Sequence, residues 1–446
     1  MPCALRQRMS RNVLFQCLKL VVALFLASIC QSLETATVGV SSDGEVVGSG
    51  PSIGSTNKFK VVIEGWRNIP HSYAVVATHL AYELVSLLPT NAQLYFTDVR
   101  LWNENWPASL QEIFPRNIQD TVNTLPMRNQ QEWRNLTIRV AFPYNTSPRS
   151  DNSKVVVVAT SEFLTVNKDV YFSDGVETAL DAVRDTEASV IILTHSKWSQ
   201  TGFINTGFPP RKVSIVPLGV SSDFRPLTVL EKREARSHFL GNPNTTVFFS
   251  NGAMTSNKGI DLLLKIFKLL LDNYPDCCLL VLKGLDKMYS SKWRLSDWVY
   301  QYKLPVGSVR YDGQMLSTKQ LNLLYNSVDV YVSPYKAEAF NLPVLEAMAC
   351  GLPVIVTSGG STDDFVPEHS MGTMLVKSKL VKAPKNISLH DSDGRWLEPD
   401  EDHLLKVMEH FLQNRKSVQA AASKNNVKAA ASFTWKQFAR GAIDLF

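Results

Sequence analysis

The stretch SPYKAEAFNLPVLEAMACGLPVIVT, residues 333–357, decides the fold of this chain. An apolar run at residues 328–332 comes just before it and predicts a buried strand. A short polar loop follows, and then a helix that Pro343 can open and Gly351 can close. The run of apolar and β-branched residues at 352–356 predicts a second strand, parallel to the first. We therefore expect the stretch to form one complete βαβ unit.

Two glutamates mark this unit, Glu338 in the loop and Glu346 one turn into the helix. The loop lies at the carboxyl end of a parallel strand and at a helix N-terminus, where unpaired N–H groups favour an anion such as a diphosphate. Glu346 would then accept hydrogen bonds from a nucleotide ribose, and Glu338 would face the group that the phosphate carries. The alternative interpretation is that Glu338 caps a loop and Glu346 only complements the helix dipole.

The residues around the two glutamates favour the first interpretation. Residues 338–351, EAFNLPVLEAMACG, closely resemble the E-x7-E signature of family-4 glycosyltransferases, which are retaining sugar transferases of the GT-B fold. That family usually has glycine at the positions of Ala339 and Asn341. Because asparagine tolerates a positive φ angle better than most residues, a tight loop is still expected at Asn341.

The resemblance implies a specific donor site. The expected donor is a nucleotide-diphosphate sugar, bound as a co-substrate, and neither a cofactor nor a metal ion is needed. Glu338 would hold the hydroxyl groups of the sugar, and Glu346 would hold the ribose. The other residues expected to bind the donor are Phe340, Asn341, Leu342, Gly252 and Gly313, the last of them where relatives cradle the nucleotide base.

A basic residue, Lys258, joins the candidate site from another loop. A helix is expected over residues 258–273, and a lysine in its first turn opposes the helix dipole. A bound anion explains that position better than helix stability does, although a solvated lysine is the alternative. Under the family resemblance, Glu338 and Lys258 are the catalytic residues.

The same loop departs from the family at one position. Relatives have an arginine and a lysine five positions apart, which hold the diphosphate and neutralise the leaving group. Lys258 matches the lysine, but Ala253 stands where the arginine is usual. Either another basic residue substitutes, with Arg67 and Lys336 as candidates, or the protein binds its donor without efficient turnover.

The first half of the chain contains fewer residues that indicate a functional site. A predicted strand leads into the loop GWRNIPHSY and then into a helix over residues 72–88. Because ligands of open α/β sheets bind at the carboxyl edge of the sheet, His71, Ser72 and Tyr73 are expected to point at a cleft. The resemblance places this loop between donor and acceptor, where His71 would orient a phosphate or an acceptor hydroxyl; alternatively, it is a helix-start histidine satisfied by the backbone. His195, at a later strand end, is expected to be structural rather than a catalytic base.

Length and turn signals predict two domains. A chain of 446 residues is too long for one typical core. We expect an α/β protein of the GT-B type, with two Rossmann-like domains that face a central cleft: an acceptor domain at residues 58–222 and a donor domain at residues 240–430. The turn PLGV between them resembles the family's link. Residues 431–446 would form a helix that crosses back to the first domain, capped by Thr434.

Composition argues against a nucleic-acid partner. The chain has 45% hydrophobic and 20% charged residues, which is typical of globular proteins. Its formal charge is +5, but the leader contributes four basic residues and no acid, so the remainder carries only about +1. No basic patch interleaved with aromatic residues is visible in the sequence.

The N-terminus predicts entry into the secretory pathway. A basic region precedes the apolar run LVVALFLASIC, so residues 1–30 are expected to be a signal peptide or an uncleaved signal anchor. An anchor would make the chain a single-pass membrane protein, and either form places the globular part in the ER or Golgi lumen or outside the cell. Residues 31–57 are rich in Ser, Thr and Gly and predict a disordered stem. A cytosolic protein with an apolar start is the alternative.

Sequons and cysteines add little to that prediction. Four Asn-x-Ser/Thr sequons fit a glycoprotein, but about as many are expected by chance. They lie at Asn135, Asn145, Asn244 and Asn386. Outside the leader, the cysteines are too few for a disulfide framework or a zinc site.

Together these observations predict a retaining glycosyltransferase. It would move a hexose-type sugar from a nucleotide-diphosphate donor to a glycan, lipid or protein acceptor. The runner-up is a catalytically weakened nucleotide-sugar or glycan-binding protein on the same fold, suggested by Ala253. A GT-B epimerase or phosphorylase would share the fold, but we do not expect such an enzyme to have the E-x7-E signature.

Overall fold

The computed structural model describes most of residues 59–445. The residues that it does not describe are 1–58, 102–112, 128–133, 151–152, 168–170, 174, 186–188, 242–243, 287–290, 385–392 and 446. The predicted signal segment and stem, and the sequon at Asn386, therefore lie outside the described residues. Within the described part, no helix combines the length and the apolar character needed to span a bilayer.

The first half of the chain forms a six-stranded parallel sheet in the order β2-β1-β3-β4-β5-β6. Its central strands consist of buried, mostly β-branched residues, as expected for a sheet that helices cover on both faces. The strands are β1 (Phe59–Gly65), β2 (Ala92–Asp98), β3 (Leu136–Val140), β4 (Lys154–Val158), β5 (Val190–Thr194) and β6 (Val213–Ile215). The helices are α2 (Ser72–Leu87), α3 (Arg116–Asn123), α4 (Val176–Arg184) and α5 (Lys197–Asn205), with a 3-10 turn at Pro210–Lys212.

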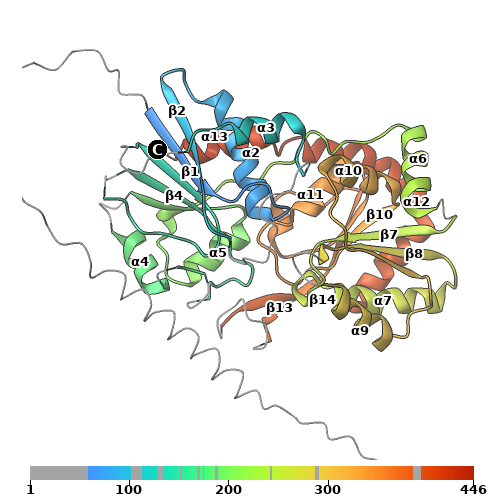
Figure 1. Cartoon of the computed structure of the whole chain (residues 1–446). Coiled ribbons are helices and arrows are strands. Elements are labelled where there is room, and N and C mark those ends of the chain that lie inside the picture. The colour runs from blue at the N-terminus through green and yellow to red at the C-terminus, as the bar shows by residue number, and fades with distance from the viewer. Residues whose placement is uncertain are drawn as a thin grey trace, which may run out of the picture. The chain divides into compact units, whose positions relative to one another are not determined.

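The second half forms another six-stranded parallel sheet, in the order β12-β11-β10-β7-β8-β9. In Figure 1 the first sheet runs from blue to green and the second from yellow-green to orange. The strands are β7 (Thr246–Asn251), β8 (Cys278–Lys283), β9 (Val309–Asp312), β10 (Val330–Ser333), β11 (Val354–Thr357) and β12 (Thr373–Val376). The helices are α6 (Val229–Leu240), α7 (Ile260–Asn273), α9 (Ser291–Gln301), α10 (Thr318–Ser327) and α11 (Leu342–Ala349), with 3-10 turns at Ser256–Lys258 and Ser361–Asp364. An antiparallel hairpin, β13 (Ser378–Lys382) and β14 (Arg395–Pro399), stands apart from the sheet.

The two C-terminal helices run from the second half of the chain to the first. Helix α12 (Glu401–Ala430) packs against α7 and α11, and α13 (Trp435–Ile443) packs against α2. The Trp435 ring stacks on His79 of α2 with a centroid distance of 4.6 Å, and Thr434 and Gln437 form the expected capping box. The link between the two sheets passes close by, since a Cβ atom on Gly219 would lie 2.1 Å from the backbone N of Trp435. Only glycine permits this approach.

The βαβ unit of residues 333–357 is present as predicted, with β10, α11 and β11 in order. The predicted start of the helix at Lys258 is wrong. Lys258 ends a separate 3-10 turn, and Gly259 follows in the left-handed conformation (φ 70°) before α7 begins at Ile260. The left-handed residue breaks the run of helical hydrogen bonds, so Lys258 lies on a turn rather than on the first turn of the helix.

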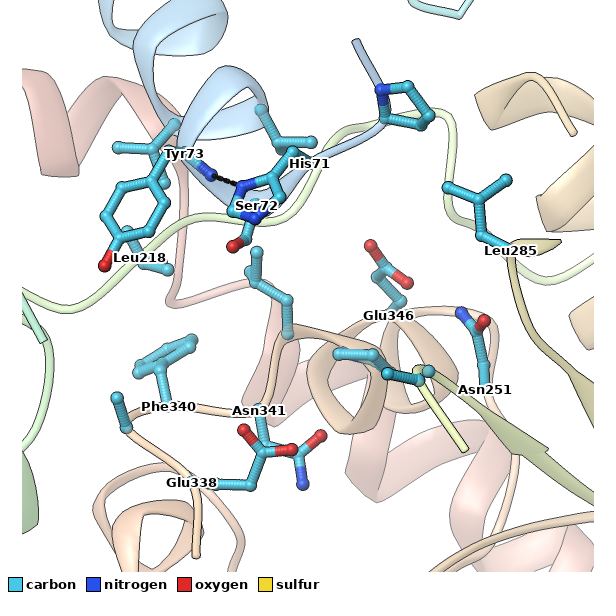
Figure 2. A pocket seen from close by; sticks show the side chains of 18 of the residues that line it. His71, Ser72, Tyr73, Leu218, Asn251, Leu285, Glu338, Phe340, Asn341 and Glu346 are labelled. Carbon is cyan, nitrogen blue, oxygen red and sulfur yellow. Dashed lines mark hydrogen bonds between the residues drawn. The ribbon is translucent and has the colours of Figure 1, made fainter. Parts of the chain in front are cut away.

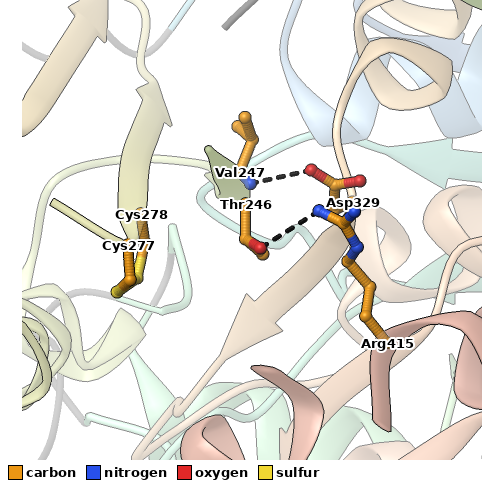
Figure 3. Close-up of a disulfide and its surroundings, with 6 residues drawn as sticks. All are labelled: Thr246, Val247, Cys277, Cys278, Asp329 and Arg415. Carbon is orange, nitrogen blue, oxygen red and sulfur yellow. Dashed lines mark hydrogen bonds between the residues drawn. A yellow bond between two sulfur atoms is a disulfide. The ribbon is translucent and has the colours of Figure 1, made fainter. Parts of the chain in front are cut away.

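The structure contains one disulfide among the described residues, whereas the sequence argued only against a disulfide framework and a zinc site. Cys277 and Cys278, which are neighbours in the sequence, are joined by a disulfide just where β8 begins (Figure 3). Thr246, at the start of β7, pairs with Cys278 in the sheet. The disulfide therefore lies at the amino edge of the second sheet, and the carboxyl edge carries the candidate site.

Candidate active site

A cavity of about 650 Å³ lies between the carboxyl edges of the two sheets. Its walls come from both halves of the chain: the β1–α2 loop, residues after β4, the link near Gly219, the loop after β7, the ends of β8 and β9, and the β10–α11 loop. Apolar and aromatic residues form the larger part of its lining, together with many polar and charged side chains. Apolar walls with polar groups that fix the orientation of the ligand are typical of sites for small organic molecules.

Glu338 and Lys258 form the central ion pair of the cavity. The Lys258 Nζ lies 2.5 Å from Glu338 Oε1, and the Glu338 side chain is only 9% exposed. The backbone holds the two segments together, because the O atom of Asn257 accepts from the N–H groups of Lys336 and Ala337 at 2.8 and 3.1 Å. Burial raises the pKa of Glu338, and the Lys258 ammonium opposes that shift. The structure thus brings together the two residues predicted to be catalytic.

The loop after Glu338 turns as the sequence predicts. Asn341 adopts the left-handed conformation at φ 73°, and its Nδ2 donates to Ser333 Oγ at 3.0 Å. Helix α11 begins directly after it, so the N–H groups of its first turn lie beside the cavity that Phe340 and Leu342 line. From the first half of the chain, Ser196 Oγ donates to the O atom of Ala339 at 2.6 Å. Both halves therefore shape this loop.

Glu346 lies on the first turns of α11 and lines the same cavity. Its Oε2 accepts a 2.8 Å hydrogen bond from the Tyr325 hydroxyl, which also accepts from Asn251 Nδ2 at 3.2 Å. Burial raises the pKa of Glu346 to about 7. Figure 2 shows the Glu346 carboxylate toward Asn251 and Leu285, away from Glu338. The two carboxylates thus occupy different parts of one cavity, with the loop and helix start between them.

The predicted acceptor loop also lines the cavity, at His71, Ser72 and Tyr73. His71 itself caps α2, since its Nδ1 accepts from the Tyr73 N–H at 3.2 Å. Burial lowers the pKa of His71 to about 4, so its ring is neutral at pH 7. The Tyr73 hydroxyl lies 2.5 Å from that of Tyr144. His71 can orient a ligand by hydrogen bonding but not as a cation.

His195 also lines the cavity, and its ring has a backbone partner. Its Nδ1 lies 3.1 Å from the O atom of Val216, and burial lowers its pKa to about 4.

Of the two glycines expected to bind the donor, Gly252 lines the cavity and Gly313 does not. The residues that follow Gly313, Gln314 and Met315, do belong to the cavity wall. A Cβ on Gly313 would lie 2.2 Å from Asp286, so this glycine accommodates the neighbouring loop.

Neither candidate for the missing arginine reaches the cavity. Arg67 is paired with Asp98 at 2.6 Å, and Lys336 lies 3.3 Å from Glu398 and over the Trp396 ring. Neither side chain belongs to the cavity wall. Both predictions are wrong because nearby carboxylates hold these cations on other surfaces, which a sequence does not reveal.

Two charged residues in the wall were missed by the sequence reasoning. Glu162 follows β4, and its Oε2 accepts from Asn257 Nδ2 at 3.1 Å, which brings it close to the Lys258–Glu338 pair. Its charge contributes to the raised pKa of Glu338. Lys283 ends β8 and lines the opposite part of the cavity. Lys283 could have been predicted as a site residue, because it is a charged residue at the carboxyl end of an otherwise apolar strand.

Comparisons with known proteins relate part of this chain to sugar transferases. Residues 231–389 match the family described as Glycosyl transferases group 1. The chain is 28% identical over 186 residues to the phosphatidylinositol N-acetylglucosaminyltransferase gpi3 subunit of Schizosaccharomyces pombe, a match that covers 40% of this chain and 36% of the relative. It is 30% identical over 161 residues to a GDP-mannose-dependent monoacylated alpha-(1-6)-phosphatidylinositol monomannoside mannosyltransferase of Corynebacterium glutamicum, covering 34% of this chain and 40% of that protein. The match therefore spans well under half of either relative.

Solved structures resemble the chain over a greater length. Anabaena Alr3699/HepE in complex with UDP and glucose superimposes with a TM-score of 0.62 at 14% identity, covering 86% of this chain and 98% of that one. WaaG, a glycosyltransferase involved in lipopolysaccharide biosynthesis, gives 0.58 at 13% identity, with 86% and 98% covered. At these identities the likeness concerns the fold alone. Residues 231–389 therefore match a group 1 glycosyltransferase domain, and the described part of the chain has the GT-B fold.

Proposed function

We propose that this chain is a glycosyltransferase, which moves a hexose-type sugar from a nucleotide-diphosphate sugar to an acceptor with retention at the anomeric carbon. The observation that carries the proposal is the partly buried Lys258–Glu338 pair, which lies in the cavity beside the start of α11. Lys258 and the N–H groups of that helix start supply positive charge where a diphosphate would leave. Because they stabilise the leaving group themselves, the transfer is proposed to need no metal ion.

In this proposal each residue has a defined task. Glu338 holds the hydroxyl groups of the donor sugar, and Glu346 accepts hydrogen bonds from the ribose. The bond between the anomeric carbon and the diphosphate oxygen breaks, and the acceptor oxygen bonds to the same face of the sugar. The acceptor proton passes to the departing phosphate oxygen, so a nucleoside diphosphate is released. Glu162, which follows β4 of the first sheet, lines the same cavity and is proposed to face the acceptor.

The test is a panel of nucleotide sugars offered to the full chain, with binding and release of nucleoside diphosphate both measured. Glycan, lipid and protein acceptors are added separately. We expect one donor to support release, and Glu338→Ala to abolish that release. Release that is unchanged in Glu338→Ala would contradict the assigned role.

The raised pKa of Glu346 makes nucleotide binding depend on pH. The carboxylate accepts ribose hydroxyls best when it is ionised, and burial holds its pKa at about 7. Lowering the pH from 8 to 6 protonates it, so we expect the affinity for a nucleoside diphosphate to fall by up to about tenfold. Calorimetric titration at several pH values measures this. Glu346→Gln should bind more weakly at pH 8 and lose most of the pH dependence; a variant with the wild-type profile would contradict the role.

A second candidate function is donor binding without efficient transfer. The loop after β7 bears Ala253 in the cavity wall, and neither Arg67 nor Lys336 reaches the cavity. A missing contact to the charged leaving group would lower the transfer rate about a hundredfold or more. Tight binding of one donor with no release, across all acceptors of the panel, would favour this candidate.

We also propose that the globular part lies in the lumen of the secretory pathway. The support is the basic and apolar pattern of residues 1–30. Translation of the full chain with microsomal membranes tests this: residues 59–445 should become protected from added protease. Complete digestion in intact microsomes would overturn the proposal.

A further inference from the structure

Lys283 lies at the end of the cavity that the proposed mechanism leaves unused. Its side chain is part of the cavity wall, yet the residue is only 5% exposed. Its Nζ donates to the O atom of Gly284 at 2.5 Å and to the O atom of Gln314. It thus joins the end of β8 to the loop after β9.

No carboxylate among the described residues forms an ion pair with Lys283. Two acids whose charges act on Lys283 have other hydrogen-bond partners: Asp286 accepts from the Tyr311 hydroxyl at 2.7 Å, and Asp312 accepts from the Gln314 N–H at 2.8 Å. Burial lowers the pKa of Lys283, and the charges of these two acids oppose the shift. A buried ammonium of this kind is stabilised by any further acceptor that enters the cavity.

The Lys283 ammonium has an N–H group left to donate to such an acceptor. An ammonium group has three N–H donors, and the two backbone carbonyls use two of them. One donor therefore remains for a ligand. An oxygen acceptor on the ligand would be favoured there, whereas a ligand amino group would bring its own N–H donors against the lysine N–H and be disfavoured.

The position of Lys283 indicates which part of a nucleotide it meets. Lys283 pairs in the sheet with Asn251, which is hydrogen-bonded through Tyr325 to Glu346. Figure 2 shows Leu285 and Asn251 on the Glu346 side of the cavity, away from Glu338. With the ribose on Glu346 and the sugar diphosphate toward Glu338, the base extends toward Lys283. Apolar walls for the face of a base come from Leu285, Met315 and Leu316.

We propose that Lys283 is a specificity-determining residue, which donates a hydrogen bond to a carbonyl oxygen of the nucleobase and so favours uracil or guanine over adenine. The inference rests on the proposed function, since it takes the nucleotide to be bound with its ribose on Glu346. Uracil and guanine carry ring carbonyls, whereas adenine presents an amino group and no carbonyl. A hydrogen bond from a charged donor is strong enough to select between them by about tenfold or more.

Calorimetric titration of the full chain with UDP, GDP and ADP tests the inference. We expect UDP or GDP to bind at least about tenfold more tightly than ADP. Lys283→Met should reduce that preference to below about threefold while it changes the affinity for ADP little. Lys283→Arg, which keeps a cationic donor, should retain the preference. The control is Lys258→Met, which should weaken all three nucleotides by one common factor because it acts on the shared diphosphate.

Two results would overturn the assignment. One is a wild-type protein that binds the three nucleotides equally; the other is a Lys283→Met variant that loses the same factor for all of them, since the lysine would then act on the diphosphate or on the fold alone. Failure of the proposed function looks different, because the wild-type protein would then bind none of the three.

Discussion

Lys258→Met is expected to lower the rate of sugar transfer by about a hundredfold or more. The lysine ammonium is placed to neutralise the charge that develops on the departing diphosphate, and losing one such contact costs on the order of 3 kcal/mol of transition-state stabilisation. The change also leaves Glu338 without its 2.5 Å partner in a buried place, so the pKa of Glu338 should rise further. Release of nucleoside diphosphate under saturating donor measures the effect.

The matched control is Lys265→Met, on α7. Lys265 lies seven positions further along and is paired with Glu401 at 2.6 Å, with both side chains about half exposed. Exposed ion pairs contribute little, so this variant should transfer sugar at close to the wild-type rate. A Lys258→Met rate within about threefold of wild type would show that the leaving group is stabilised without this lysine.

Gly259→Ala is expected to destabilise the fold strongly. Gly259 has φ 70°, and an added Cβ would lie 1.9 Å from the O atom of Pro334, which begins the loop that carries Glu338. Backbone would have to move, so we expect a loss of at least about 3 kcal/mol in the free energy of unfolding. The displaced loop should also separate Lys258 from Glu338. Thermal unfolding and nucleotide binding measure the two effects.

Gly241→Ala provides the comparison for that variant. Gly241 has a similar angle, φ 64°, at the end of α6, but an added Cβ there would meet nothing within 4 Å. It should therefore show only the cost of a left-handed alanine, about 1–2 kcal/mol, with normal nucleotide binding. Equal losses of stability for the two variants would mean that the backbone at Pro334 moves away from the added Cβ without a measurable loss of free energy of unfolding.

The parts of the site that could be predicted lie in one continuous segment. Glu338, Asn341 and Glu346 belong to a single βαβ unit, whose loop and helix follow from local signals such as Pro343 and the apolar strands. Local propensity and tertiary structure agree there, so the sequence was sufficient. The same holds for the capping box that begins α13.

The parts that were missed depend on segments far apart in the chain. Glu162 reaches the Lys258–Glu338 pair through Asn257, which is 95 positions away, and Lys283 reaches Gln314 across 31 positions. Conversely, Arg67 has the right charge but is held by Asp98. The sequence shows that a cationic side chain exists. The acidic residue with which it pairs in the structure decides where that side chain lies.

The measurement that tests the central claim most directly is a crystal structure of the full chain with a bound nucleoside diphosphate. The account predicts the diphosphate within hydrogen-bond distance of Lys258 Nζ and of the first N–H groups of α11, with the ribose hydroxyls on Glu346. A nucleotide bound outside the cavity between the two sheets, or one with its ribose on Glu338 and its phosphates away from Lys258, would contradict it.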